Sequence, residues 1–586
     1  MLNQESSNNA ESIFSNMGIK DLESLFSNIK KYTVNYLPII SAYCNAIGLQ
    51  KTINSLVDSK MLVQPGAIVQ AMVLDTLSGR SPLYRLEEFM TDQDIDLFIG
   101  PGLNSSSFSD TNINRSMDAI FDFGSSKLLT EICLNASNIF TLDCSKVSYD
   151  TTATNVWGDY TACKSDNPPA GPHIVHGHSK DGHPELKQFM TELLCVERGI
   201  PIFGSTLDGN ISDKDNNNTM LTRISKIMAK HGLGKTAFVY IADSAVVTNK
   251  NLQLLGNTPF ITRFPENYKN CKNAIAEAVK ANNWQDLGFL SELQSPKSRP
   301  SSKYLAYETN VEINNNKYRA IVMHSNAHES RMLKRLDKSI ITFQKELTKK
   351  LSKSRKKFAC RIDADNAANG FRNLSNKLYD VCAEIKINER PSRGRPPKNE
   401  KERKVIKEFF IEVSLKLNME EVSRRREKAG CLVLLTNLPV EGENAVDAKG
   451  IFKAYKGQYG VESNFCFLKD PLIVNDLFLK KPSHIDVLGM VLIISLLIWR
   501  LMERTMRNYI HNNKGTLPGL NKQKTTRPTS YMMTTKFHGI IIAIIGKRRI
   551  LLNKLDVEAI PYLSALGLDK NVFSNPYTKC NPIFKE

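Results

Sequence analysis

Residues 455–469 read Tyr-Lys-Gly-Gln-Tyr-Gly-Val-Glu-Ser-Asn-Phe-Cys-Phe-Leu-Lys. Counted from Glu462, Tyr455 lies seven residues before, Gln458 four residues before and Lys469 seven residues after. On a helix these offsets fall on one face. The stretch therefore predicts one amphipathic helix that presents a carboxylate, a phenol, an amide and an ammonium group in a line. The opposite face carries the apolar side chains Val461, Phe465 and Leu468, which can pack against a core.

This set of side chains suits a site that combines a metal ion with a phosphate group. A carboxylate such as Glu462 holds a divalent cation, and a lysine such as Lys469 contacts a phosphate oxygen. The alternative is a solvated amphipathic helix, because charged stripes are common on protein surfaces. Two upstream aspartates, Asp150 and Asp243, favour the metal site, because each stands where a partner carboxylate is needed.

The composition indicates a globular protein with an anionic partner. The 586 residues are 41% hydrophobic and 24% charged, which fits several domains with ample core. The formal net charge of +18 favours nucleic acid as the partner, with an acidic membrane surface as the weaker option. The eleven cysteines include no Cys-x-x-Cys pair, which fits a reducing cytoplasm and argues against disulfides or a cysteine zinc site.

The sequence predicts neither a signal peptide nor a membrane span. Residues 1–16 are polar and contain no apolar signal core. The longest apolar run, residues 487–499, is too short to span a bilayer and ends at Arg500. We therefore expect a buried helix at this position and a cytoplasmic protein.

Strands alternate with helices after a helical start, which predicts an α/β fold. The strands are expected at residues 139–149, 200–204, 237–243, 259–264, 409–417 and 431–436, and a basic helix at 219–231. The predicted domains are a polar tail at 1–32, a helical DNA-end-binding or scaffold domain at 33–136, a first core part at 137–265, an insertion at 266–428, a second core part at 429–510 and a basic region at 511–586.

Asp150, Asp243 and Glu462 are the candidate catalytic residues and metal ligands. Two of them end or flank predicted strands, and acidic residues at strand ends often meet in a site. Three carboxylates would repel one another unless they held divalent cations, and two Mg²⁺ ions suit in-line attack on a phosphodiester. As alternatives, Asp150 caps a turn through its own backbone, or Asp143 replaces it from the opposite strand face.

A histidine cluster at positions 173, 176, 178 and 183 raises the possibility of a zinc site. A turn is the favoured interpretation, because Gly177 and the Lys180-Asp181-Gly182 stretch punctuate the cluster. Asp181 and Asp213 are weaker candidates to support the carboxylates.

The insertion is expected to contain a β-hairpin over residues 304–323 and then two apolar seams at helical spacing. The seams, at 333–351 and 371–385, suggest an antiparallel helical hairpin. The first ends in a lysine-rich run that favours a phosphate contact over a solvated face.

Residues 392–398 read Ser-Arg-Gly-Arg-Pro-Pro-Lys and resemble the core of an AT-hook. In such a segment Arg393 and Arg395 can enter a narrow A·T minor groove. A basic, proline-rich linker has the same composition, so both interpretations stay open.

Several short motifs in order resemble the DDE transposases of bacterial insertion sequences, in the insertion-sequence 4 superfamily and its 1634-type branch. The ordered set is specific, whereas each motif alone is soft, and the likeness covers most of the chain. The motifs are Tyr149-Asp150-Thr151-Thr152 with Trp157-Gly158-Asp159-Tyr160, Gly177–Asp181 with Pro184–Gln188, Gly209-Asn210 with Asp213, Ala242-Asp243, and Tyr455, Gln458, Glu462 and Lys469.

The resemblance implies an RNase H-like mixed-sheet core that is interrupted by an insertion domain before the helix of Glu462. It carries the catalytic triad onto Asp150, Asp243 and Glu462 and the Tyr-Arg-Glu-Lys signature onto Tyr455, Gln458, Glu462 and Lys469. The usual arginine is Gln458 here, which removes a bidentate phosphate clamp. Members of the superfamily are thought to excise through a hairpin with a flipped base, for which Trp284 is a candidate holder.

The sequence therefore predicts a transposase that binds the terminal inverted repeats of its own element as double-stranded DNA. It would cleave and join strands with Mg²⁺, for which Mn²⁺ can substitute, and would act as a dimer that holds two ends. Two alternatives remain at this stage: a decayed or domesticated DNA-binding protein, and an RNase H-like nuclease without strand transfer.

Overall fold

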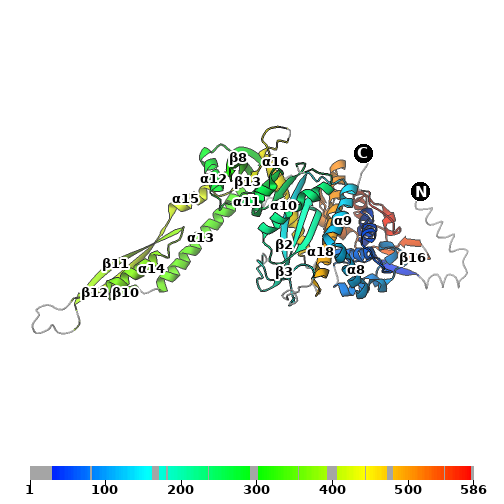
Figure 1. The fold of residues 1–586 in the computed structure, drawn as a ribbon, viewed down its shortest axis with the longest axis horizontal. Coiled ribbons are helices and arrows are strands. Elements are labelled where there is room, and N and C mark those ends of the chain that lie inside the picture. Colours follow the sequence, from blue (N-terminus) through cyan, green and yellow to red (C-terminus); the bar gives the residue numbers. More distant parts are fainter. Residues whose placement is uncertain are drawn as a thin grey trace, which may run out of the picture. The chain divides into compact units, whose positions relative to one another are not determined.

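The computed structural model describes residues 29–79, 82–160, 170–179, 182–234, 236–290, 301–353, 356–391, 393, 405–442, 444–470, 479–546 and 548–581. The chain forms two compact units (Figure 1). The first comprises Met1–Thr262 with Ala454–Glu586, and the second comprises Arg263–Lys453. The second unit thus contains the expected insertion, 266–428, together with residues 429–453.

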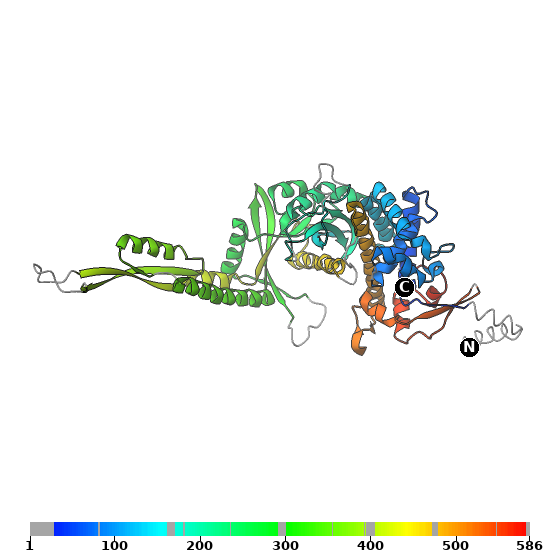
Figure 2. The same cartoon turned by 90° about the horizontal axis from the view of Figure 1, so that it is seen from below.

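Helices fill the N-terminal region, where the apolar periodicity predicts them. Four of them, α3, α5, α8 and α9, contact the long helix α18 (Pro482–Asn513) near the other end of the chain. Figure 2 shows these helices in blue and cyan beside α18 in orange. Their bounds are α3 Leu37–Ala46, α4 Leu49–Leu56, α5 Pro65–Leu77, α6 Leu86–Thr91, α7 Ile95–Phe98, α8 Asp110–Phe123 and α9 Ser125–Phe140.

The first unit contains a mixed set of strands in the order β4-β3-β2-β5-β6. β2 pairs antiparallel with β3 and parallel with β5, β3 pairs antiparallel with β4, and β5 pairs parallel with β6. Helices α10 (Asp213–Lys230) and α11 (Asn249–Leu255) belong to the same region. The strand bounds are β2 Lys146–Val156, β3 Lys187–Val196, β4 Ile200–Leu207, β5 Val239–Ala242 and β6 Phe260–Arg263. The chain is therefore of the mixed α/β class.

Two sequence expectations in this region are wrong in detail. Residues 139–140 are the end of α9, so the strand predicted at 139–149 begins only at Lys146 and runs on to Val156. Asp150 therefore lies inside a strand and not after one. Residues 30–32, expected in the polar tail at 1–32, belong to strand β1 (Lys30–Thr33), because β16 (Ile541–Ile545) from the other end of the chain pairs with this strand.

The segment after residue 453 supplies helices that cover the first unit. The helix predicted at 455–469 is two helices, α16 (Ala448–Gly457) and α17 (Tyr459–Leu468), that meet at Gln458. Helix α18 is long and apolar enough to cross a membrane, but 83% of its most apolar window is buried inside the protein, as expected for a core helix. The remaining bounds are β14 Leu517–Pro518, β15 Lys524–Thr525, α19 Ser530–Lys536, β16 Ile541–Ile545, β17 Arg548–Leu551 and α20 Ala559–Ala565.

The second unit contains strands in the order β13-β9-β8-β7 and a separate ribbon in the order β10-β12-β11. The expected hairpin is confirmed as β8 and β9, whose turn places Asn314 and Asn315 at positive φ. The bounds are α12 Lys269–Ala281, β7 Gln285–Phe289, β8 Lys303–Ile313, β9 Asn316–Ser325, α13 Asn326–Lys353, β10 Lys357–Phe358, α14 Arg361–Arg372, β11 Tyr379–Pro391, β12 Val405–Leu417, α15 Met419–Glu427 and β13 Cys431–Thr436.

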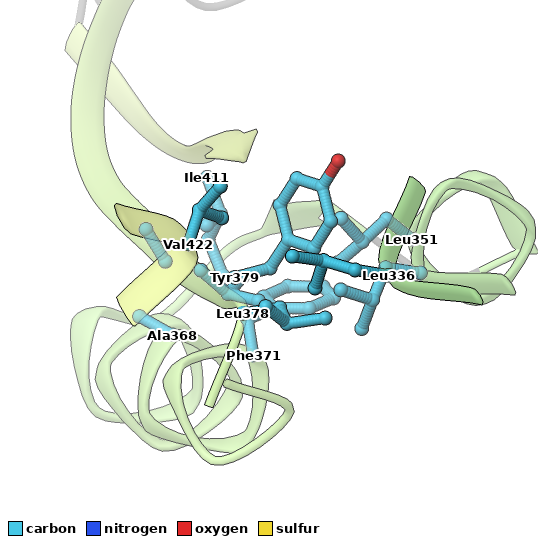
Figure 3. Packing of buried hydrophobic residues seen from close by; sticks show 11 residues of the cluster. Leu336, Leu351, Ala368, Phe371, Leu378, Tyr379, Ile411 and Val422 are labelled. Carbon is cyan, nitrogen blue, oxygen red and sulfur yellow. The ribbon is translucent and has the colours of Figure 1, made fainter. Parts of the chain in front are cut away.

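The expected helical hairpin in this unit is half wrong. The first seam lies on the helix α13. The second seam begins at the end of α14, which stops at Arg372, and continues on the strand β11. In β11, buried Tyr379, Val381 and Ala383 alternate with exposed residues, so the strand period overlaps the helical spacing of Leu378, Val381 and Ile385. Figure 3 shows the resulting core, to which α13, α14, α15 and both long strands contribute.

Candidate functional site

Asp150 and Asp243 lie on neighbouring strands of the first unit. In the parallel pair of β2 and β5, Tyr149 is the partner of Ala242. The next residue is Asp150 within β2 and Asp243 directly after the end of β5. Parallel partners point to the same face of a sheet, so the register brings the two aspartates side by side. Asp150 is half-buried in the strand interior, and its Oδ1 accepts a hydrogen bond from the Thr151 amide at 2.8 Å.

Asp243 stands at the point where β5 ends and a short helical turn begins. Its Oδ1 accepts a hydrogen bond from the Ala245 amide at 3.0 Å. Its carbonyl oxygen accepts a hydrogen bond from the Thr262 hydroxyl at 2.7 Å, which ties the end of β5 to β6. The backbone that carries this carboxylate is thus held from two sides.

Helix α17 carries Glu462 and packs on β2. Its buried side chains are Val461, Phe465 and Leu468, as the sequence predicts, and Glu462 is exposed. The buried Asn464 donates hydrogen bonds to the Gly199 carbonyl at 2.6 Å and to the Cys195 sulfur at 3.4 Å. These contacts anchor α17 against β3 and the turn that follows it.

The face on which α17 sits is the face that carries Asp150. Cys195 is the strand partner of Ser148, and Ser148 and Asp150 point to one face because side chains alternate along a strand. Burial raises the pKa of Cys195 to about 12, and the Asp150 charge contributes to the increase while Asn464 and Arg500 oppose it. The helix of Glu462 and the strand of Asp150 therefore face each other.

Arg500 of α18 links the two helices. Its Nε donates to Asn464 Oδ1 at 2.8 Å, and its Nη2 donates to Ser463 Oγ at 2.9 Å. Its Nη1 pairs with the buried Glu503 carboxylate at 2.8 Å, and Arg507 pairs with the same oxygen at 3.1 Å. This polar cluster fixes the turn of α17 that contains Ser463 and Asn464. It therefore also positions the preceding residue, Glu462.

Gly460 permits this arrangement because α17 approaches the backbone of a neighbouring turn closely. A Cβ atom at position 460 would stand 2.1 Å from the Arg198 carbonyl oxygen, which is far inside the contact distance of two atoms. The same turn places Arg198 and Gly199 at positive φ. Any larger residue at 460 would push α17 away from the strands.

The opposite face of β2 contains a buried carboxylate, Glu192 of β3, which is fully inaccessible to solvent. It accepts a hydrogen bond from the Tyr149 hydroxyl at 2.9 Å and pairs with Arg223 of α10 and Ser205 of β4. Burial and the Glu192 charge raise the pKa of Tyr149 well above its ordinary value. Because Tyr149 directly precedes Asp150 in β2, this network stabilises the strand on the face opposite to Asp150.

The remaining signature residues have different environments. Tyr455 of α16 and Lys469, which follows α17, are half-buried. Gln458 is buried, with 7% of its surface exposed, at the junction of α16 and α17. The expected single face with four polar groups in a line is therefore interrupted at Gln458.

The other candidates are not gathered at this position. His173 lies 3.4 Å from Asp208, and His183 lies 2.9 Å from Glu185, both on the surface. Asp213 accepts a hydrogen bond from the Thr151 hydroxyl at 2.9 Å, on the Glu192 side of β2. Asp143 precedes β2 and accepts a hydrogen bond from the Ser145 amide, while Asp181 lies outside the described residues.

In the second unit, Trp284 is half-buried and packs against Tyr307 and His324, with ring centroids 6.3 and 5.9 Å away. Arg393 is exposed, and Arg395 lies outside the described residues. Across the described part of the chain, no group of three or more His, Cys, Asp or Glu side chains has the geometry of a metal site.

Sequence reasoning missed the residues that hold the site together: Asn464, Arg500, Glu503, Glu192 and Arg223. A polar residue inside an apolar run is the signal that marks them. Glu192 interrupts the apolar strand β3, and Asn464 stands between the apolar residues of α17.

Comparison with known proteins adds one match. Residues 29–134 match a family described as a domain of unknown function, DUF4277, which is found in transposase-like proteins. The match covers the helical region before β2. No curated protein matches the chain.

Proposed function

We propose that this protein is a metal-dependent DNA transposase with an RNase H-like core, in which Asp150, Asp243 and Glu462 form the catalytic triad. The observation that carries the proposal is the parallel register of β2 and β5, which brings Asp150 and Asp243 together, with the helix of Glu462 packed on the same face. The strand order β4-β3-β2-β5-β6 with only β3 antiparallel to its neighbours supports an RNase H-like core. The net charge of +18 supports a DNA partner, and the match to DUF4277, a domain found in transposase-like proteins, supports the transposase assignment.

Asp150, Asp243 and Glu462 offer the oxygen ligands that Mg²⁺ prefers, and this ion keeps several of its waters, although the three carboxylates of the described chain do not already stand in the geometry of a metal site. When bound, two such ions would activate the attacking oxygen and stabilise the leaving oxygen of a phosphodiester. Asp150 and Asp243 would hold the metal from the strands and Glu462 from α17. Lys469 and Tyr455 would bind phosphate oxygens near the cut, because both keep part of their surface in solvent.

The first step would be attack by water and the second would be attack by a 3′-hydroxyl on target DNA. The protein would therefore hold two element ends at once, which a dimer provides. The closely fixed α17 favours this chemistry, because a ligand on a helix pinned by Asn464 and Arg500 keeps its position through both steps.

The test is cleavage of DNA that carries the ends of the element, with Mg²⁺, by wild type and by Glu462→Gln. Glu441→Gln, which removes an exposed carboxylate elsewhere, is the matched control. We expect wild type and control to cut at the ends, and Glu462→Gln to bind with unchanged affinity and to lose at least a thousandfold in rate, about 4 kcal/mol.

Three other outcomes separate the alternatives. Binding without cleavage by wild type would favour a decayed DNA-binding protein. Cleavage without joined products would favour a nuclease that lacks strand transfer. Cleavage by Glu462→Gln at the wild-type rate would remove Glu462 from the triad.

A further inference from the structure

Helix α13 carries a row of exposed cations along the side that faces solvent. We call this row the cationic stripe, and it consists of Arg331, Lys334, Arg335, Lys338, Lys345 and Lys349, all of which are exposed. At about 100° per residue, these six positions fall within an arc of about 100°. From Arg331 to Lys349 the stripe extends about 27 Å along the helix.

The stripe lies opposite the side of α13 that packs inside the second unit. Leu336, Leu347 and Leu351 are buried in the core shown in Figure 3. Their positions on the helix are about half a turn away from the stripe. Because the leucines hold one side of α13 against the core, the packing of the second unit keeps the stripe on the opposite, solvent-facing side of the helix.

Carboxylates of α13 do not neutralise the stripe. Glu329 pairs with His324 at 3.5 Å and Asp337 pairs with Arg426 of α15 at 3.2 Å, so both serve contacts within the unit. The third carboxylate, Glu346, lies at the margin of the arc. The helix as a whole has eight lysines and arginines against these three acids.

The neighbouring ribbon of β10, β11 and β12 shows the opposite arrangement. Its cations pair with its own carboxylates across the strands. The pairs are Lys357 with Glu408 at 3.0 Å, Arg390 with Glu408 at 2.9 Å, Lys407 with Glu389 at 3.1 Å, and Lys386 with Glu412. Charge is thus balanced on the ribbon and left unbalanced on α13.

The spacing within the stripe makes the imbalance unfavourable for the helix alone. Arg331 and Arg335, Lys334 and Lys338, and Lys345 and Lys349 are like-charged pairs at i and i+4, which repel on a helix surface. An ordinary solvated helix alternates charges of both signs. A linear anion placed along the stripe would relieve this repulsion.

We propose that the cationic stripe of α13 binds the phosphate backbone of duplex DNA, an inference that rests on the DNA-binding part of the proposed function. Duplex DNA is a stiff row of charges longer than the stripe, so it matches a row fixed on one helix. Four of the six residues are lysines, which contact phosphate as point charges and do not read base edges in pairs. The stripe therefore adds affinity for any sequence and leaves the choice of sequence to other residues.

The test compares two triple variants that remove the same charge from the second unit. The stripe variant is Lys338→Gln with Lys345→Gln and Lys349→Gln. The control variant is Lys272→Gln with Lys280→Gln and Lys317→Gln, three exposed lysines of α12 and β9. Glutamine keeps helix propensity close to that of lysine, and circular dichroism checks that both variants fold.

Affinity for DNA with the element ends and for an unrelated duplex is measured from about 50 to 300 mM salt. We expect the stripe variant to lose about tenfold to a hundredfold in affinity for both duplexes, and its slope of log affinity against log salt to fall by about 2.7, since each lost phosphate contact removes about 0.9. The salt slope of the control variant should differ from the wild-type slope by no more than about 0.9, which corresponds to one phosphate contact.

An unchanged slope and affinity in the stripe variant, with wild-type binding intact, would overturn the stripe. The proposal would also be overturned if the stripe variant bound vesicles of anionic lipid more weakly than wild type does but bound DNA as tightly as wild type. Absence of DNA binding by wild type at low salt would instead overturn the DNA partner of the proposed function. These results are distinguishable because the first two keep a wild-type signal and the third does not.

Discussion

Arg500 Nε donates a hydrogen bond to Asn464 Oδ1 at 2.8 Å, and this contact joins the central helix α18 to the helix that carries Glu462. Asn464 is fully buried and also donates to the Gly199 carbonyl. One amide side chain thus holds together a strand turn and two helices. The geometry of the candidate site depends on residues that touch neither substrate nor metal.

Asn464→Ala should destabilise the first unit. The change removes the hydrogen bond to the Gly199 carbonyl and one of the three side-chain hydrogen bonds of Arg500, which costs about 1–3 kcal/mol. Urea unfolding measures this loss through Trp499, whose ring packs 5.9 Å from Phe467 of α17, with Trp157 and Trp284 replaced by phenylalanine. Cys466→Ala, at an exposed site on the same helix, should change stability by less than about 0.5 kcal/mol. Equal effects from both variants would contradict the role of Asn464.

Glu192→Gln should also destabilise the first unit, by about 3 kcal/mol. The change leaves the Arg223 guanidinium next to a neutral amide in a buried network. The same Trp499 signal reports the loss. Adding Arg223→Gln should cost little more than Glu192→Gln alone, since the two residues act as a pair. Full additivity of the two changes would show that they do not interact.

Gln458→Arg should not restore a phosphate clamp. Gln458 is buried where α16 meets α17, so an arginine there must bury a charge or distort the junction. We expect a lower unfolding midpoint and no gain in affinity for end DNA. Gln458→Met, of similar volume, should keep both near wild type. A tighter complex with unchanged stability in Gln458→Arg would refute this view of the junction.

Thiol labelling should separate Cys466 from Cys195. Burial raises the pKa of Cys195 to about 12, so at pH 8 it stays a thiol and does not react. Cys466 is exposed on α17, four residues from Glu462 and on the same side of the helix. Alkylation mapped by mass spectrometry should modify Cys466 and not Cys195.

The same labelling tests the position of DNA. End DNA with Mg²⁺ should slow modification of Cys466 several-fold. The exposed Cys360 beside α14 serves as the internal reference. Protection of both cysteines to the same degree would indicate general shielding and not occupancy at α17.

The pair of Asp118 and His484 predicts an acid-sensitive contact between α8 and α18. Although burial opposes it, the hydrogen bond and charge of His484, with Lys481, lower the pKa of the Asp118 carboxyl. A lowered pKa adds stability above the unfolded value near 4, and this stability is lost as the pH falls through the folded value. Because half of the Asp118 side chain is exposed, the contribution is below about 1 kcal/mol.

Asp118→Asn should therefore lower the melting temperature slightly at pH 7. The difference from wild type should begin to shrink below about pH 4, where the carboxyl of the unfolded chain becomes protonated, and should close only when the pH falls below the lowered folded-state pKa. A series of thermal unfolding curves from pH 3 to pH 8 measures the gap. A gap that widens towards low pH would show that the Asp118 carboxylate does not stabilise the contact with His484.

The sequence predicts much of the fold because local patterns decide the elements. The apolar seam of α13, the β8–β9 hairpin and the buried faces of α17 and α18 follow from periodicity and burial. The strand β3 escapes this reasoning because it is buried on both faces and shows no alternation. Its side chains, Glu192 included, are explained only by β2, β4 and α10 packed around it.

For the candidate site, too, local sequence patterns predict one part and tertiary contacts decide the rest. Asp243 is predictable because a carboxylate directly after an apolar strand is a local signal. Asp150 and Asp243 lie close together because of the register between two strands that are about 90 residues apart in the sequence. No local sequence pattern contains this register. The break between α16 and α17 falls two residues before Gly460, whose close approach to the Arg198 carbonyl is a tertiary contact that no local pattern contains.

The first unit is built from two stretches of sequence with Arg263–Lys453 between them, and this order has a consequence during synthesis. A ribosome that adds about 5–20 residues per second completes β5 roughly ten to forty seconds before it reaches α17. During that interval the sheet face that bears Asp150 has no cover from α17, and the second unit is being synthesised. A chain that ends within residues 263–453 therefore contains the strand that bears Asp150 but lacks both α17 and the central helix α18.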